Sequence, residues 1–120
     1  MNITEDYVSF EVAKLLKEKG FDEKTLSYYE DNVLCRGDWF EWNRSPLGHI
    51  AAPTHQMAMK WLREKGVYMS IDTVISSSGN IYFNIDTYSE ESGWNHPVDF
   101  YESYEEAVEA ALKYSLENLI

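Results

Sequence analysis

The sequence predicts an α+β fold in a single domain of residues 1–120, because two kinds of hydrophobic period occur in separate segments. Three segments repeat apolar residues at helical spacing, and two adjacent segments alternate apolar and polar residues as half-buried strands do. A length of 120 residues fits one domain. We therefore expect the order α-(short β)-α-β-β-α, with a small antiparallel sheet packed against two or three helices.

The first helix is predicted over residues 10–19. Ser9 is a preferred N-cap residue, Gly20 supplies the left-handed conformation that ends many helices, and Phe21 is expected to fold back on the last turn. The buried stripe is expected to consist of Val8, Val12, Leu15 and Leu16.

Residues 21–52 have the least regular pattern. Short strands are predicted over residues 25–29 and 33–36, and Gly37-Asp38 is expected to break the second strand. The same reasoning assigns a turn to residues 30–32, strand-like composition to 39–42 and a loop to 43–48. We expect little regular structure around these pieces.

A second helix is predicted to begin at Pro53-Thr54, with Thr54 as its N-cap, and to end at Gly66. Its core-facing residues recur at helical spacing and are Met57, Ala58, Trp61 and Leu62.

The next two segments predict an antiparallel hairpin around residues 76–80. One face is expected to be buried, formed by Val67, Met69, Ile71, Thr73, Ile75, Ile81, Phe83, Ile85 and Thr87. We predict the register that pairs Ile75 with Ile81, because a slip of two residues would bring Asp72 against Asp86 and the like charges would repel.

The last helix is predicted to start after Ser103, which forms a capping box with Glu106. Its buried stripe is expected to be Val108, Ala111, Leu112, Leu116 and Leu119.

Acidic residues outnumber basic ones by 21 to 10, for a formal net charge of −11. Residues 66–120 contribute ten acidic side chains against Lys113 alone, a net charge of −9. Nucleic-acid-binding proteins need a basic surface to displace counterions from phosphates, and an anionic membrane repels the same negative field. We therefore expect neither nucleic acid nor a membrane as a direct partner.

The sequence also indicates a cytoplasmic location. Its first residues lack the basic start and apolar run of a secretory signal, and no apolar stretch approaches the ~18 residues of a membrane span. Cys35 is the only cysteine, which is consistent with a reducing compartment.

Residues 51–56 read Ala-Ala-Pro-Thr-His-Gln and residues 60–64 read Lys-Trp-Leu-Arg-Glu. With these motifs the chain resembles a group of small uncharacterised acidic proteins from Bacteroides-type genomes, phages and mobile elements. Residues 8–21 resemble the opening of that group and residues 104–112 its ending, so the likeness spans most of the chain. The group has no established activity. The resemblance therefore implies a phage or mobile-element accessory protein and carries over no catalytic residue.

We identify no catalytic, cofactor-binding or metal-binding signature in the sequence. The histidines, at positions 49, 55 and 96, lack the spacing of zinc motifs. Cys35 has Arg36 beside it, but neighbours in a strand point to opposite faces. His96 and Asp99 could form a loop hydrogen bond or a weak ligand pair.

A protein-binding surface is predicted on the outer face of the hairpin, where tyrosines and carboxylates alternate with the buried residues. Tyrosine is enriched at binding hot spots, although a solvated or helix-covered sheet face would show the same pattern. The predicted contact residues are Tyr68, Asp72, Tyr82, Asp86, Tyr88, Trp94, Glu90, Glu91, Glu102 and Glu105. The acidic residues from Glu90 to Glu109, Asp99 and Glu106 included, are expected to surround the start of the last helix.

The leading hypothesis is a non-enzymatic accessory protein that binds a basic protein partner through this acidic, tyrosine-bearing surface, and one version of it is mimicry of nucleic-acid phosphates. An alternative is a small-ligand-binding protein or small enzyme with a cleft around the hairpin of residues 67–88, lined by Asp72, Asp86, Tyr82 and His96. A homo-oligomer built by pairing of sheet edges is a third.

Overall fold

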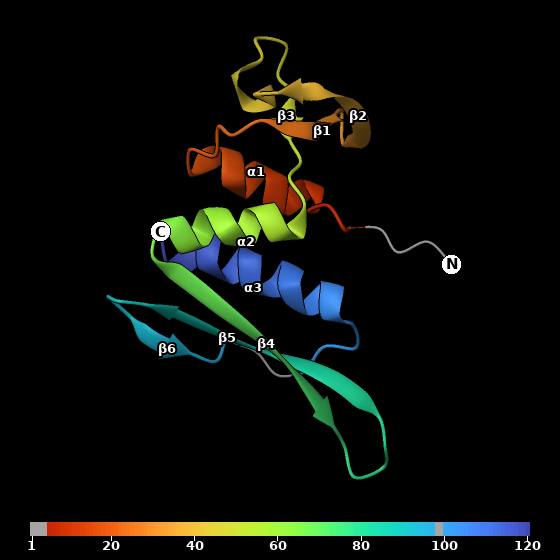
Figure 1. The fold of residues 1–120 in the computed structure, drawn as a ribbon, viewed down its shortest axis with the longest axis vertical. Helices are drawn as coiled ribbons and strands as arrows, with labels where there is room; N and C mark the ends of the chain where they lie inside the picture. Colours follow the sequence, from red (N-terminus) through yellow and green to blue (C-terminus); the bar gives the residue numbers. More distant parts are fainter. Residues whose placement is uncertain (1–4, 98–99) are drawn as a thin grey trace. The chain divides into compact units, whose positions relative to one another are not determined.

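The computed structural model describes residues 5–97 and 100–120. In this part of the chain three α-helices and two antiparallel sheets of three strands each form an α+β fold (Figure 1). The predicted class is confirmed, but the expectation of one sheet is wrong, because the strands of residues 25–51 pair among themselves. The chain divides into two compact units, Met1–Ala58 and Met59–Ile120. The single domain stays a prediction.

Helix α1 (Phe10–Glu18) forms as predicted. The Oγ of Ser9 accepts a backbone hydrogen bond of 3.2 Å from the first turn. At the other end, the φ angle of Gly20 is +95° and the amide of Phe21 donates to the carbonyl of Leu16 at 2.9 Å. These are the marks of a Schellman motif, in which glycine avoids the steric cost of a Cβ in the left-handed conformation.

Strands β1 (Thr25–Glu30) and β2 (Val33–Phe40) pair antiparallel in the first unit. The turn between them has φ angles of +50° at Asp31 and +66° at Asn32. Two successive positive φ angles define the type I′ turn, whose twist matches that of a hairpin. The predicted strands and their turn are confirmed.

Gly37-Asp38 does not end the second strand, so that prediction is wrong. Arg36 lies opposite Ser27 and Phe40 opposite Thr25, which leaves three residues of β2 facing one residue of β1. A β-bulge of this kind accommodates residues with low strand propensity without ending the ladder.

Residues 43–48 were predicted as a loop, and two short elements overlap or follow this range. Residues Trp42–Arg44 form a 3₁₀-helix, η1, and β3 (Ile50–Ala51) pairs with β1 to give the order β2-β1-β3. The side chain of Asn43 connects them, because its Nδ2 donates to the carbonyl of Phe21 and its Oδ1 accepts from the amide of Ala51, both at 2.7 Å. These contacts span 22 and 8 residues of the chain, and neither has a local sequence signal.

Helix α2 (His55–Glu64) also forms as predicted. The Oγ1 of Thr54 accepts a hydrogen bond of 3.2 Å from the amide of Met57. The boundary between the two units falls inside this helix, after Ala58. Of the predicted core residues, Ala58, Trp61 and Leu62 are buried and Met57 is partly buried.

The sheet of the second unit has the order β4-β5-β6. Its strands are β4 (Val67–Ile75), β5 (Ile81–Ser89) and β6 (Gly93–Asn95). The predicted register is confirmed, since Ile75 lies opposite Ile81 and Tyr68 opposite Tyr88. Strand β6 was not predicted, because its three residues lie in a polar stretch.

Helix α3 (Tyr104–Asn118) packs on one face of this sheet (Figure 1). The Oγ of Ser103 accepts a hydrogen bond of 3.1 Å from the amide of Glu106, as the capping signal predicts. Ala107 and Ala111 of the helix form a core with Ile85. The helical residues Val108, Ala111, Leu112 and Leu116 are buried, also as predicted.

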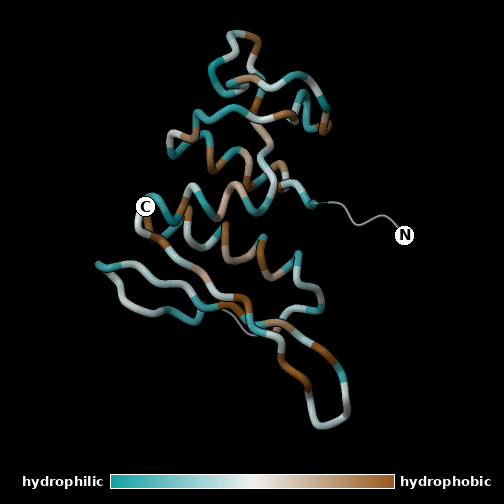
Figure 2. Tube along the Cα trace, in the orientation of Figure 1, coloured by the Kyte–Doolittle hydropathy of each residue, from teal (hydrophilic) through white to brown (hydrophobic). Residues whose placement is uncertain are grey.

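The inward face of the hairpin is buried only in part, which corrects the prediction. Ile75 and Ile81 at the tip are 67% and 55% exposed, whereas Val67 and Ile85 are buried. A helix of 15 residues is ~22 Å long, and a strand of nine residues is ~30 Å long. The tip therefore extends beyond α3, with hydrophobic segments on both of its strands (Figure 2).

Candidate binding surface

The face of the β4-β5-β6 sheet opposite α3, here called the outward face, carries most of the predicted contact residues. Side chains alternate along a strand. Met69 and Ile71 pack toward the core beneath α3, so that Tyr68 and Asp72 point the other way. In Figure 1 α3 lies on one side of this sheet, and the outward face is on the other.

Three aromatic residues, which we call the aromatic row, cross all three strands at one level of the outward face. Tyr68 lies opposite Tyr88, and Tyr88 lies opposite Trp94. The ring centroids are 6.4 Å apart in the first pair and 5.2 Å in the second. Tyr68 is 47% exposed and Trp94 is 61% exposed, so the row is open to solvent although its members support one another.

A second aromatic pair lies farther along the outward face. The ring centroids of Tyr82 and Phe100 are 6.0 Å apart, and Phe100 is 59% exposed. The backbone of Tyr101 exchanges two hydrogen bonds of 2.8 Å with Phe83, which aligns this segment beside β5. Sequence reasoning missed Phe100. The adjacent aromatic residues 100 and 101 were its only signal, because neighbours in an extended segment face opposite sides.

The two aspartates of the outward face have different partners. Asp86 contacts His96 through its Oδ1 and the ring Nδ1, and the Oγ of Ser70 donates to Asp72 at 3.3 Å. Asp72 lies opposite Asn84, so the carboxylates are not directly paired across the strands. One pocket within residues 65–120 and another within residues 5–57 are lined by side chains other than Asp72, Asp86 and His96. The structure brings Asp86 and His96 of the alternative cleft into contact, and that cleft stays a prediction.

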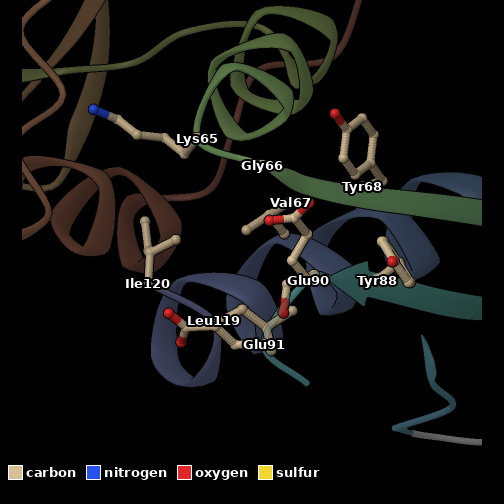
Figure 3. Close-up of a pocket in the computed structure, with 10 residues that line it drawn as sticks. Lys65, Gly66, Val67, Tyr68, Tyr88, Glu90, Glu91, Leu119 and Ile120 are labelled. Carbon is tan, nitrogen blue, oxygen red and sulfur yellow. The ribbon is translucent and has the colours of Figure 1, made fainter. Parts of the chain in front are cut away.

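Glu90 and Glu91 line a pocket at the end of the sheet (Figure 3). This pocket also includes Leu119 and Ile120, which follow the end of α3. Glu90 and Glu91 thus lie near the end of the last helix rather than near its start, contrary to our expectation. The reason is topological, because α3 returns along the sheet and brings its last turn to the β5–β6 turn.

Two other predicted acidic residues lie at the start of the last helix, as expected. Glu102 and Glu105 are exposed at the start of α3, where negative charge interacts favourably with the helix dipole. Asp99, the expected partner of His96, lies outside the described residues.

His49, in the first unit, combines a hydroxyl and a carboxylate around one imidazole. Its Nδ1 is 2.9 Å from the Oγ of Ser45, and its Nε2 is 3.9 Å from Glu30. In a Ser-His-Asp triad the serine is on Nε2 and the acid on Nδ1, which is the reverse of this arrangement. The Oγ of Ser45 also accepts from the amide of Leu47 at 3.2 Å, so these contacts indicate a structured loop.

Cys35 lies opposite Tyr28 in the first sheet, and its thiol donates to the carbonyl of Val33 at 3.5 Å. Desolvation raises the pKa of the Tyr28 phenol, and the electrostatic influence of the neighbouring Cys35 and Glu30 raises it further. These neighbours differ from the histidine or cation that activates a catalytic thiol.

Among residues 5–97 and 100–120, no group of three or more His, Cys, Asp and Glu side chains is arranged to hold a metal ion. No helix in the same residues is long and apolar enough to cross a membrane.

Comparison with family models, with curated proteins and with solved structures finds no match to this chain. The resemblance to the Bacteroides-type group therefore stays an expectation.

Proposed function

We propose that this chain is a non-enzymatic accessory protein, of the phage or mobile-element kind that its sequence resembles, and that it binds a basic segment of a protein partner on its outward face. The observation that carries this proposal is the aromatic row on the sheet face opposite α3, in which Tyr68 and Trp94 are exposed on either side of the partly buried Tyr88. Soluble proteins seldom expose grouped aromatic side chains unless the patch binds something.

The negative charge of residues 66–120 indicates the chemistry of the partner. Residues 66–120 carry a net charge of −9, with Asp72 and Asp86 on the outward face and Glu90 and Glu91 beside it. Aromatic faces attract guanidinium and ammonium groups, and a negative field speeds the encounter with a basic partner. An Arg- and Lys-rich segment satisfies both features together.

The proposal predicts salt-sensitive binding of a fluorescent Arg-Gly repeat peptide, measured by fluorescence anisotropy. Binding is expected at about 50 mM NaCl and is expected to weaken at about 300 mM, because salt screens exposed charges. Trp94→Ala is expected to weaken binding about tenfold, which corresponds to about 1.4 kcal/mol, because it removes the most exposed ring of the row.

Trp39→Ala is the matched control. Trp39 is 54% exposed, close to the 61% of Trp94, but it lies on β2 of the other sheet. The control should bind the peptide as the parent does. The proposal is wrong if the Arg-Gly peptide does not bind, if a Glu-Gly peptide binds equally well, or if both tryptophan variants lose affinity to the same degree.

A further inference from the structure

The pocket at the end of the second sheet, here called the sheet-end pocket, combines features that suit one type of side chain. It is formed where β4 begins, where β5 ends and where α3 ends (Figure 3). Its volume is about 790 Å³ and it is open to solvent. The lining residues that determine its chemistry are Lys65, Tyr68, Tyr88, Glu90 and Glu91.

Two walls of the pocket have complementary chemistry. Tyr68 and Tyr88, which belong to the aromatic row, supply two aromatic rings with centroids 6.4 Å apart. Glu90 and Glu91 supply carboxylates from the turn that follows β5. Neither carboxylate forms a hydrogen bond or ion pair with the part of the chain that the structure describes.

The cation that lines the pocket is engaged elsewhere. The Nζ of Lys65 lies over the ring of Trp61, 4.9 Å from its centroid, in a cation–π contact. The positive charge of Lys65 is thus directed to an indole ring and leaves Glu90 and Glu91 without a basic partner. A cation from outside the chain would supply that partner.

We infer that the sheet-end pocket binds an arginine side chain of the basic partner, an inference that rests on the proposed function. A guanidinium is planar, so it stacks on a tyrosine ring while its edge donates two parallel hydrogen bonds to a carboxylate. An ammonium is a compact, strongly hydrated charge and makes only one of these contacts well. The pocket therefore distinguishes arginine from lysine, which the charge of the outward face alone does not.

The test uses N-acetyl-L-arginine amide as the probe and N-acetyl-L-lysine amide as its comparison. Each is titrated into the ¹⁵N-labelled full chain, and amide chemical shifts are followed. The arginine probe is expected to cause saturable shifts at Val67, Tyr68 and residues 88–91, with an affinity at least about threefold higher than that of the lysine probe. The double variant Glu90→Gln/Glu91→Gln is expected to lose these shifts.

The double variant Glu102→Gln/Glu105→Gln is the matched control, because it removes the same charge from exposed glutamates at the start of α3. It should bind the arginine probe as the parent does. The inference is overturned if neither probe gives saturable shifts, if both probes bind equally, or if the two double variants lose affinity equally, which would show a diffuse charge effect.

Phe100→Ala separates this inference from the proposed function, since Phe100 lies on the outward face against Tyr82 and does not line the pocket. This variant should bind the arginine probe normally while its affinity for the Arg-Gly peptide falls. If the unsubstituted protein binds the Arg-Gly peptide but not the arginine probe, the pocket inference is wrong, and the proposed binding to the outward face is retained. If the parent binds neither, both fail.

Discussion

Gly37 shows at the scale of one residue what a sequence pattern leaves undecided. Glycine before aspartate suggested the end of a strand, because both residues have low strand propensity. In the structure a Cβ at this position would lie 2.8 Å from the Cζ2 of Trp42 and 2.9 Å from the Cε1 of Tyr28. Those two rings stack with centroids 4.1 Å apart. Glycine is needed here for close approach of the rings to the backbone.

Gly37→Ala is therefore expected to destabilise the protein by about 1–3 kcal/mol, the usual cost of overpacking. At an open site with ordinary backbone angles the same substitution stabilises by about 0.4–1 kcal/mol, so the sign of the change is informative. Urea unfolding followed by tryptophan fluorescence measures the effect. Asp38→Ala, at the exposed neighbouring position, serves as the control and should change the stability little. A stability gain in Gly37→Ala would contradict the close packing.

At the scale of elements, helices and hairpins with local signals were predicted well. Ser9, Thr54 and Ser103 each accept the backbone hydrogen bond expected of an N-cap. Capping and turn formation involve residues three or four apart, so the information is local. Strands β3 and β6 were missed, because two or three residues show no period and are defined only by the strand they pair with.

Ser103→Ala tests one of these caps. The substitution removes the acceptor for the amide of Glu106 and is expected to lower the free energy of unfolding by about 1 kcal/mol. Ser103→Asp should retain most of the stability, because aspartate caps helices about as well as serine. Urea unfolding followed by circular dichroism compares the three proteins. Equal losses in both variants would mean that the hydroxyl does more than cap α3.

At the scale of the whole molecule, the division into two units leaves the single-domain prediction to be tested. The boundary after Ala58 lies inside α2, so one continuous helix contributes to both units. Helix formation is cooperative, and a half-formed α2 would lose much of its stability. We therefore predict that both units unfold together in one transition.

The two substitutions above provide the measurement, because Gly37 lies in the first unit and Ser103 in the second. Circular dichroism and tryptophan fluorescence are expected to report coincident transitions in the parent protein and in both variants. Two separate transitions, with each variant moving only one of them, would instead identify two domains.

The candidate surface was predictable in part, because strand period and charge are properties of the local sequence. Alternation and charge repulsion were sufficient to pair Tyr68 with Tyr88 and to place Asp72 and Asp86 on the outward face, since register depends on period and on neighbouring strands. Those features, the acidic charge of residues 66–120 and the α+β class are properties of local order and composition. The amino-acid sequence alone determines these features, without reference to the tertiary structure.

The tertiary structure alone decided which predicted residues meet. It places Trp94 in the aromatic row through β6. It places Glu90 and Glu91 near the end of α3, and it divides the strands between two sheets. Strand β6 pairs with residues of β5 that lie within eight positions along the chain, whereas the other two outcomes depend on contacts between residues far apart in the chain. Such contacts depend on how whole helices and strands pack together, so a local sequence pattern does not predict them.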